Sequence, residues 1–388
     1  MSVGIDEISF YTSNYFLDLK TLAEVQGTDP DKYYTGIGQE KMGMAAPDED
    51  VVTMAANAAL PLIESAGTEG VSTLMFATET GIDQSKAAGI YVHRLLGLND
   101  NCRVVELKQA CYSATAALQM ACALVARKPD SKVLVIASDI ARYDLDTPGE
   151  ATQGCGAVAM MVTASPRLVS IDPEVGNYAE DVMDFWRPNY RSTALVDGKY
   201  STKIYLKALK KAWDHFRYVS PLTFSDFSHF CYHLPFSRMA QKAHQQLVRH
   251  NKAGLSAEQQ NAQIDKTLVY NRTIGNSYTA SMYIGLTSLL DNTAEDLSGK
   301  RIGFFSYGSG CVGEFFSGTV VPGYRDALHA ARHHEMLTAR QEISHDEYLE
   351  LYRHQVPTDG GEHRFAEGTT GRFRLAGISH HKREYVPR

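Results

Sequence analysis

Hydrophobic and polar positions along this chain follow two different spacings. Short apolar runs bounded by polar residues predict buried strands, and longer stretches with helical spacing lie between them. The predicted strands are Thr73–Thr78, Lys132–Ala137, Ala157–Val162, Phe230–His233 and Arg301–Ser306, and the main predicted helices are Tyr112–Ala126 and Tyr278–Leu290. Because strands and helices alternate, the sequence predicts an α/β protein.

The order of these elements occurs twice, each time as a strand, a helix and a second strand. The two helix starts are alike, reading ACYSATAAL from Ala110 and NSYTASMYI from Asn276, which lie 166 residues apart (276 − 110). We therefore predict two similar halves, residues 1–167 and 168–388, whose central helices begin close together across a pseudo-twofold axis. The polar tail after Asp326 is expected to hold one helix, Ala327–Ala339, and then a loop-like end.

Composition and charge narrow the class of protein. The chain has 388 residues, of which 44% are hydrophobic and 21% charged, as in an ordinary globular protein with a large core. Its formal net charge of −7 argues against binding to nucleic acid or to an anionic membrane, so local Lys and Arg must hold any phosphate-bearing ligand. The apolar runs are too short to span a bilayer.

The cysteines and the N-terminus indicate a reducing, cytoplasmic setting. Asp6 and Glu7 stand where a signal peptide needs basic residues followed by an apolar run. The six cysteines are scattered, without CxxC pairs and without the Cys/His spacing of a metal site. We therefore expect free thiols and no bound metal.

Cys111 is the candidate nucleophile. It stands between an extended segment, Val104–Lys108, and a helix rich in small residues. A thiol at a helix N-terminus faces unpaired N–H groups, which favour the thiolate that attacks an acyl thioester. A buried packing role is the alternative, and on position alone it is the commoner one for a cysteine.

Two further residues at strand ends are candidates for acid–base chemistry. His233 ends an apolar strand before Pro235, where it could donate a hydrogen bond to a reacting carbonyl or simply fill the core. Glu79 follows the apolar run LMFAT; most glutamates there are solvated, but one half-buried over Cys111 would have a raised pKa and take a proton from carbon. Two glycine-rich runs, QGCGAVAMMV and FSYGSGCVGEFFSG, match neither the P-loop nor the dinucleotide fingerprint.

With these residues in place, the sequence resembles the bacterial 3-hydroxy-3-methylglutaryl-CoA synthases of the mevalonate pathway. The likeness runs in order to about Tyr324 through GIDEISFY, YTGIGQEKM, VVTMAANAA, LMFATET, ELKQACYSAT, VLVIASDIARY, GEATQGCGAVAMMV, DFWRP, YHLPFSRM, GNSYTASMY and FSYGSGCVGEFFSGTVVPGY. The resemblance implies a thiolase fold of five layers, α-β-α-β-α, with the site where the halves meet. It also implies a homodimer and a reaction without metal or redox cofactor.

The resemblance further implies a role for each candidate residue. Cys111 would be acetylated by acetyl-CoA, Glu79 would remove a proton from the acetyl methyl group, and His233 would polarise and protonate the ketone of acetoacetyl-CoA. Asn276 and Ser309 would lie in the acetoacetyl pocket, with the backbone N–H groups of Cys111 and Ser309 stabilising oxyanions. The substrate and coenzyme A channel would be lined by Asp29, Tyr143, Thr152, Ser201, Arg238 and Lys242. Arg238 stands where the family pattern leads us to expect Lys.

Other interpretations remain open from the residues alone. A chain-initiating ketoacyl synthase also uses Cys, His and Asn, but it forms its carbanion by decarboxylation, so Glu79 argues against it. Polyketide-branching synthases share the Cys/Glu/His set and take acyl groups from carrier proteins. A silent acyl-CoA-binding or scaffold homologue would need none of the three catalytic groups. A papain-like hydrolase is excluded, since its local signature does not surround Cys111.

Overall fold

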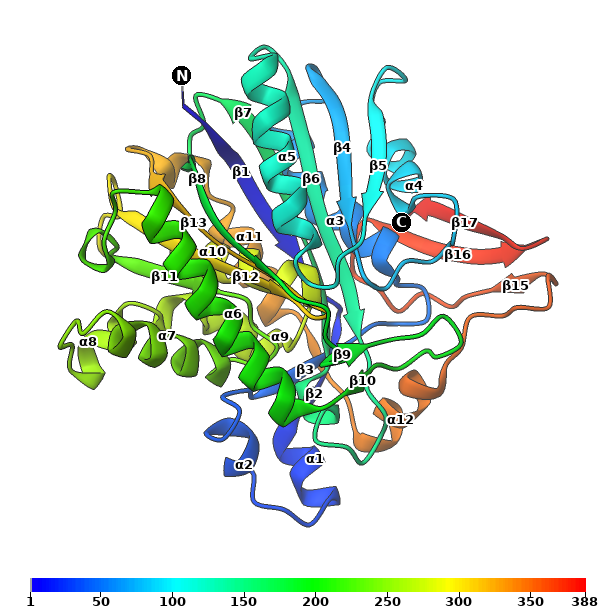
Figure 1. Ribbon diagram of the computed structural model, residues 1–388. Coiled ribbons are helices and arrows are strands. Elements are labelled where there is room, and N and C mark those ends of the chain that lie inside the picture. The colour runs from blue at the N-terminus through cyan, green and yellow to red at the C-terminus, as the bar shows by residue number, and fades with distance from the viewer. Residues whose placement is uncertain (1) are drawn as a thin grey trace.

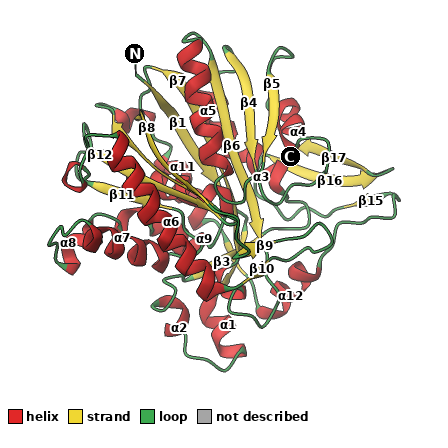
Figure 2. Cartoon of the chain, in the orientation of Figure 1, coloured by secondary structure: helices red, strands yellow, loops and turns green. Residues whose placement is uncertain are grey.

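The computed structural model describes residues 2–388 and centres on a nine-stranded sheet (Figures 1 and 2). Its strand order is β11-β12-β13-β8-β1-β7-β6-β4-β5. The first half of the chain contributes β1 (Val3–Tyr11), β4 (Val71–Ala77), β5 (Arg103–Leu107), β6 (Lys132–Ala141) and β7 (Gly154–Ala164). The second half contributes β8 (Val169–Ala179), β11 (His229–Tyr232), β12 (Arg301–Gly308) and β13 (Val312–Val320).

The two halves of this sheet have the same pairing pattern. In the first, β1 pairs antiparallel with β7, β7 antiparallel with β6, and β6 parallel with β4. In the second, β8 pairs antiparallel with β13, β13 antiparallel with β12, and β12 parallel with β11. The halves join through two residue pairs between β1 and β8, Gly4–Ser170 and Ile5–Val169. The repeated order predicted from the sequence is confirmed.

Helices form three layers around the sheet. The outer layer of the first half contains α3 (Val51–Ala66) and α4 (Ala88–Leu95), and that of the second half contains α6 (Gly198–Val219) and α7 (Arg238–His250). Between the halves lie α5 (Ser113–Arg127) and α10 (Ser281–Asn292). Figure 1 shows α6 and α7 beside β11 and α4 beside β5.

Successive apolar side chains along each strand pack against helices on opposite faces of the sheet, which produces these layers. On β4, Leu74 and Phe76 belong to the apolar cluster around α3, whereas Met75 and Ala77 belong to the central cluster with α5 and α10. On β12, Phe304 faces the central cluster and Phe305 the cluster around α6. Successive side chains of a strand point to opposite faces, so both halves of the sheet are covered on both sides. The predicted five-layer α-β-α-β-α architecture is confirmed.

The two central helices begin in the same way. Ala110 (φ +43°) and Tyr278 (φ +44°) both adopt the left-handed backbone region just before α5 and α10. Farther along, Thr115 Oγ1 and Tyr283 OH, 168 residues apart, are hydrogen-bonded at 2.8 Å across the helix pair. Ala110 and Tyr278 have the same separation, so the structural repeat differs by two residues from the offset predicted from the motif letters.

The tail folds more completely than predicted. The expected helix is present as α11 (Ala330–Thr338), but the expectation of a loop-like end is wrong. The chain continues into α12 (His345–Arg353), a short β15 (His363–Arg364), and the hairpin of β16 (Phe373–Ser379) and β17 (Lys382–Pro387). Phe373, Leu375 and Tyr385 pack into the apolar cluster around α3, and this burial stabilises the hairpin.

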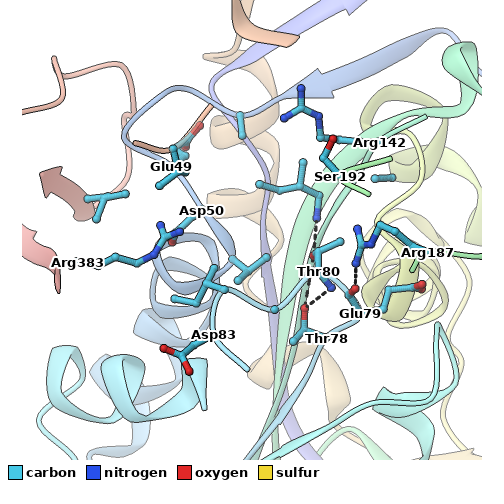
Figure 3. A pocket seen from close by; sticks show the side chains of 18 of the residues that line it. Glu49, Asp50, Thr78, Glu79, Thr80, Asp83, Arg142, Arg187, Ser192 and Arg383 are labelled. Carbon is cyan, nitrogen blue, oxygen red and sulfur yellow. Dashed lines mark hydrogen bonds and ion pairs between the residues drawn. The ribbon is translucent and has the colours of Figure 1, made fainter. Parts of the chain in front are cut away.

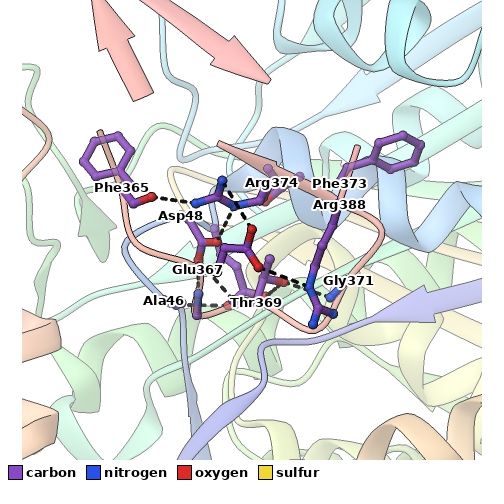
Figure 4. A network of polar contacts seen from close by, with 12 residues as sticks. Ala46, Asp48, Phe365, Glu367, Thr369, Gly371, Phe373, Arg374 and Arg388 are labelled. Carbon is purple, nitrogen blue, oxygen red and sulfur yellow. Dashed lines mark hydrogen bonds and ion pairs between the residues drawn. The ribbon is translucent and has the colours of Figure 1, made fainter. Parts of the chain in front are cut away.

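A polar network holds the tail against the first half (Figure 4). Asp48, which is fully buried, accepts hydrogen bonds from the backbone N–H groups of Gly368 (3.2 Å) and Thr369 (3.1 Å). It also pairs with Arg374, whose Nε lies 3.1 Å from Oδ2. These partners satisfy a charge that would otherwise be costly to bury.

The remaining elements are short. They are α1 (Leu19–Val25), α2 (Asp31–Tyr34), α8 (Ala257–Ala262), α9 (Val269–Ile274), the three-stranded sheet of β2 (Tyr15–Asp18), β3 (Lys41–Met44) and β14 (Gln341–Glu342), and the pair β9 (Phe185–Trp186) and β10 (Leu195–Val196). Across residues 2–388, no helix has the length and apolar character needed to cross a membrane.

Candidate active site

Cys111 lies in the turn that leads into α5. The positive φ of Ala110 bends the backbone so that Cys111 precedes the helix, and 9% of its surface is exposed. Its Sγ lies 2.8 Å from Oε1 of Glu79, the second residue after β4. The structure thus brings together two residues that are 32 positions apart in the sequence. A thiol in contact with a carboxylate is the arrangement of a nucleophile and its base.

The protonation of Cys111 differs from the sequence prediction. The pKa of the thiol is raised well above its usual value, first by burial and then by the neighbouring Glu79 carboxylate. The prediction that the helix N-terminus favours a thiolate is therefore wrong. Desolvation and a nearby negative charge outweigh the helix dipole, so the resting group is a thiol and its proton must be removed when it attacks.

The Glu79 carboxyl is neutralised more easily than an ordinary glutamate. Burial raises its pKa to about 8, and the negative charge of Asp139 adds to this effect. The guanidinium of Arg187, which donates a hydrogen bond to the Glu79 backbone carbonyl, acts in the opposite direction. Near neutral pH, Glu79 therefore exists in both protonation states, which suits a group that must accept and release protons.

Asp139, at the end of β6, ties the two halves together. Its Oδ1 accepts hydrogen bonds from the backbone N–H groups of Glu79 (2.9 Å) and Thr80 (3.0 Å) and from the hydroxyls of Thr78 and Thr80. Its Oδ2 accepts from the N–H (3.1 Å) and hydroxyl of Thr279, just before α10. One buried carboxylate thus fixes Glu79 against the start of the second central helix.

His233 directly follows β11 and is held on several sides. Its backbone N–H donates to Phe305 O at 2.9 Å, and its carbonyl accepts from Tyr205 OH at 2.9 Å. The ring stacks on Tyr205, and Nδ1 lies 3.0 Å from the hydroxyl of Ser281. Burial lowers the pKa of His233 to about 3, so the imidazole is neutral at physiological pH.

An aromatic group surrounds the nucleophile. Cys111 belongs to a small apolar cluster with Tyr143 and Tyr278, against which Phe185 of β9 packs. The ring of Phe185 meets the rings of Tyr278 and Tyr143 edge-on, with centroids 5.7 and 6.2 Å apart. These rings supply apolar walls suited to a short acyl chain.

Asn276 and Thr152 lie beside Tyr143. Asn276 Nδ2 is 3.5 Å from Tyr143 OH, and its backbone N–H donates to Thr152 O at 3.1 Å. The side-chain oxygen of Asn276 accepts from Tyr278 N at 2.9 Å. The structure therefore brings Tyr143, Thr152 and Asn276 together next to the turn before α10.

Ser309 lies against the turn that carries Cys111. Its carbonyl accepts a hydrogen bond from Gln109 Nε2 at 3.3 Å. The preceding residue must be glycine, because a Cβ on Gly308 would lie 2.5 Å from Gln109 O and 2.7 Å from Tyr112 Cβ. This close backbone contact explains part of the glycine-rich run noted in the sequence.

The four remaining predicted residues are more exposed than those around Cys111. Asp29 is exposed between α1 and α2, and Ser201 on α6 donates to Asp184 Oδ2 at 3.0 Å. Arg238 and Lys242 are exposed on the first turns of α7, with Lys242 Nζ 5.4 Å from the centre of the Phe236 ring. The N–H of Arg238 donates to Ile37 O at 2.9 Å, which brings the start of α7 next to the loop after α2.

A cavity of about 890 Å³ reaches Glu79 (Figure 3). Among the predicted catalytic residues it is lined only by Glu79. Arg142, Arg187 and Ser192 line it as well, and Figure 3 shows Arg187 next to Glu79. Cys111, His233 and Asn276 do not line this cavity.

Sequence reasoning missed several residues of the site. Asp139, Arg187 and Ser281 lie within the quoted motifs VLVIASDIARY, DFWRP and GNSYTASMY, but the sequence assigned them no role, and their contacts with Glu79 and His233 reveal one. Tyr352 of α12 donates its hydroxyl to Tyr143 O at 2.7 Å, so the tail also supports the site. Asp139 comes shortly after the predicted strand Lys132–Ala137, and a polar residue in that place is a sequence signal that could have pointed to it.

Comparison with known proteins gives a consistent result. The family model "Hydroxymethylglutaryl-coenzyme A synthase N terminal" matches residues 1–166, and the corresponding C-terminal model matches residues 169–254 and 245–359. The hydroxymethylglutaryl-CoA synthase of Enterococcus faecalis is 41% identical over 361 residues, covering 92% of this chain and 94% of the relative.

One further relative and one solved structure agree with this match. The polyketide biosynthesis 3-hydroxy-3-methylglutaryl-ACP synthase PksG of Bacillus subtilis is 34% identical, over 91% of this chain and 88% of its own. A crystal structure of an HMG-CoA synthase complexed with CoA superposes with a TM-score of 0.95 at 40% identity, covering 100% of both chains. On these matches to both halves and to the thiolase-like fold, the chain belongs to the hydroxymethylglutaryl-CoA synthase family.

Proposed function

We propose that this enzyme condenses acetyl-CoA with acetoacetyl-CoA and water to give 3-hydroxy-3-methylglutaryl-CoA and CoA, in the mevalonate route to isoprenoid precursors. The observation that carries the proposal is the 2.8 Å contact between Cys111 Sγ and Glu79 Oε1, in a chain 41% identical to a synthase of that name. A decarboxylating ketoacyl synthase does not need a carboxylate at this position.

In the first half-reaction, the sulfur of Cys111 attacks the thioester carbon of acetyl-CoA. Glu79 accepts the thiol proton and passes it to the departing CoA sulfur, so a C–S bond forms as another breaks. The contact between the two groups supports this transfer, because the pKa of Cys111 is too high for attack as a free thiolate. The backbone N–H groups of Cys111 and Ser309 are the proposed donors to the oxyanion.

In the second half-reaction, Glu79 removes a proton from the methyl group of acetyl-Cys111. The resulting enolate attacks the ketone carbon of acetoacetyl-CoA, and His233 stabilises and protonates the alkoxide. The proton that Glu79 took from the methyl group replaces the one given up by the neutral imidazole, so both groups return to their starting states. Water then cleaves the acyl-Cys111 thioester and releases the product. The raised pKa of Glu79, about 8, supports its role as a base for a weakly acidic C–H. The reaction as written needs no cofactor beyond its two thioester substrates.

The binding roles of the remaining residues are part of the same proposal. Asn276, Tyr143 and Thr152 would hold the acetoacetyl group, since they meet next to the aromatic cluster around Cys111. The more exposed set would contact coenzyme A; it consists of Asp29, Ser201, Arg238 and Lys242. Residues 1–167 would thus supply the nucleophile, the base and two residues of the acceptor pocket, Tyr143 and Thr152. Residues 168–388 would supply the acid and Asn276.

A homodimer in the cytoplasm completes the proposal. Within the described chain, β5 pairs only with β4 and leaves its other edge open. Val105 on this strand is 39% exposed and Met120 on α5 is 51% exposed, although α5 otherwise belongs to the core. An open, partly apolar edge suits pairing with a second copy. All six cysteines are free, which suits a reducing compartment.

A second candidate differs in the acyl donor. The likeness to the HMG-ACP synthase PksG favours testing whether a carrier protein delivers the acetyl group. The experiment is a product assay with acetoacetyl-CoA and either acetyl-CoA or an acetylated carrier protein. Formation of 3-hydroxy-3-methylglutaryl-CoA from acetyl-CoA supports the main proposal. Product only with the carrier protein would replace it, and absence of product with both donors would indicate a silent homologue.

A further inference from the structure

Ser281, the first residue of α10, is completely buried behind His233. Its Oγ lies 3.0 Å from His233 Nδ1 and accepts a hydrogen bond from the backbone N–H of Leu234 at 3.2 Å. The same hydroxyl therefore contacts both the imidazole ring and the backbone of the next residue. Neither the sequence motifs nor the proposed function assigns Ser281 a role.

The hydrogen count of this hydroxyl decides which imidazole nitrogen carries the proton. A serine hydroxyl donates one hydrogen and can accept at its lone pairs. Since Leu234 N–H already donates to it, the proton of Ser281 needs an acceptor, and His233 Nδ1 is the acceptor within reach in residues 2–388.

The opposite tautomer would leave a group unsatisfied. If Nδ1 carried the proton, Oγ would accept from both the ring and Leu234, and its own hydrogen would point at no acceptor. Leaving a fully buried hydroxyl hydrogen without an acceptor is unfavourable. The buried contact thus favours a ring whose Nδ1 accepts and whose Nε2 bears the hydrogen.

We propose that Ser281 is a positioning residue that holds His233 as the neutral Nε2–H tautomer, with that N–H as the donor to the ketone oxygen of the acceptor substrate. This inference rests on the proposed function for its catalytic consequence, although the tautomer itself does not depend on it. His233 then acts as a neutral electrophile that stabilises the alkoxide by a hydrogen bond, rather than as an imidazolium.

Several features of the surroundings fit this assignment. Nδ1 is occupied by Ser281, and Nε2 makes no hydrogen bond within residues 2–388, although 4% of the His233 surface remains accessible. The ring is fixed by stacking on Tyr205, and the backbone by the bonds to Phe305 and Tyr205. No carboxylate contacts the ring among the described residues, which agrees with a neutral imidazole.

The direct test is the tautomer of His233, measured by NMR on full-length protein with 15N-labelled histidine rings. The His233 signals are identified by their loss in H233N. We expect Nε2 protonated and Nδ1 unprotonated across neutral pH in the wild type. In S281A, we expect the Nδ1 signal to change and the two tautomers to exchange.

Kinetics provide the matched comparison. Ser288→Ala on the same helix is the control, because Ser288 is also fully buried, donates to Lys266 O at 2.6 Å and accepts from Tyr270 N at 3.4 Å. We expect S281A to lose roughly 10-fold or more in kcat with Cys111 acetylation unchanged, and S288A to keep both. S281T, which retains the hydroxyl, should recover the tautomer and part of the kcat.

The outcomes separate this inference from the proposed function. Observation of an Nδ1–H tautomer in the wild type, or equal kinetic losses in S281A and S288A with an unchanged His233 signal, would overturn the role of Ser281. A wild-type enzyme with the expected tautomer but without 3-hydroxy-3-methylglutaryl-CoA formation would contradict the proposed function and leave the tautomer assignment standing.

Discussion

The turns before α5 and α10 have the same backbone geometry but different chemistry. Ala110 and Tyr278 share a φ near +43–44°, and each turn leads into one of the paired central helices. The first turn presents a nucleophile, Cys111, and the second presents Tyr278. The strand ends differ in the same way, since Glu79 follows β4 and His233 follows β11.

The surroundings of the two strand-end residues explain this division. Glu79 lies near the charge of Asp139 and its pKa is raised to about 8, whereas His233 has a hydroxyl neighbour and burial lowers its pKa to about 3. Burial favours the neutral form of both groups. Glu79 of the first half can therefore gain and lose a proton near neutral pH, whereas His233 of the second half remains a neutral donor. A duplicated fold can thus specialise by changing a few residues at equivalent turns.

The largest effect is expected from removing the nucleophile of the first half. Cys111→Ala should lower turnover by at least about 10⁴-fold, because no other group in that turn can form the thioester. Cys122→Ala, on the same helix, is the control and should retain activity. A C111A variant with near-normal product formation would show that the covalent step lies elsewhere.

Removing the base should produce the next largest loss. Glu79→Gln is expected to lower the condensation rate by about 10³-fold, since the amide cannot take a proton from carbon. The measurement is product formation from enzyme that has been acetylated beforehand. If acetyl-enzyme of E79Q condenses at the wild-type rate, the base belongs to another residue.

The pH dependence of the wild type tests the same assignment. Glu79 must be ionised to act as a base, and its pKa in the folded protein is raised to about 8. The condensation rate should therefore rise as pH increases through about 8 and then level off. His233, with a pKa of about 3, should add no step between pH 5 and 9. A bell-shaped profile with an acidic limb near pH 6.5 would contradict the neutral His233.

Asp139→Asn tests how the residue that joins the two halves affects the pKa of Glu79 and the stability of the protein. Loss of the negative charge should lower the pKa of Glu79 and move the pH profile to lower pH. The Asn NH2 group also cannot accept from Thr279, so unfolding should become easier by roughly 1–3 kcal/mol. Both are measurable, by rate profiles and by denaturant titration. An unshifted profile would mean that Asp139 does not act on Glu79.

The smallest effect is expected in the tail. Tyr352→Phe removes the hydroxyl that donates to Tyr143 O at 2.7 Å and should raise the KM for acetoacetyl-CoA about 3-fold, with kcat nearly unchanged. Tyr218→Phe is the control, since Tyr218 is 88% exposed. Equal KM values for both variants would show that the tail does not support the acceptor pocket.

Much of this arrangement could be predicted from the sequence. The apolar runs identified the core strands, and the small residues after Ala110 identified the first central helix. The ordered motifs indicated the family and the residues that the fold brings together. These features depend on the order of apolar, polar and small residues close together in the chain, and that order can be read from the sequence.

Other features depend on distances that only the folded chain provides. The pKa of Cys111 was predicted in the wrong direction, because it is raised first by burial and then by contact with Glu79, 32 positions away, and both arise only in the folded chain. Asp139 and Ser281 lie in recognisable motifs, but they act through neighbours from other elements, so their roles follow only from the folded contacts. The tail looked loop-like because its few apolar residues stand among many polar ones. Phe373 and Leu375 alternate on β16, Tyr385 lies opposite Leu375 on β17, and all three are buried in the cluster around α3.

The most direct test of the division between the halves is peptide mass spectrometry after brief incubation with acetyl-CoA alone and an acid quench. The account predicts one added acetyl group on the Cys111 peptide, and its loss with formation of 3-hydroxy-3-methylglutaryl-CoA once acetoacetyl-CoA is supplied. Acetylation at another residue, or none at Cys111 under conditions where acetyl-CoA supports turnover, would contradict the account.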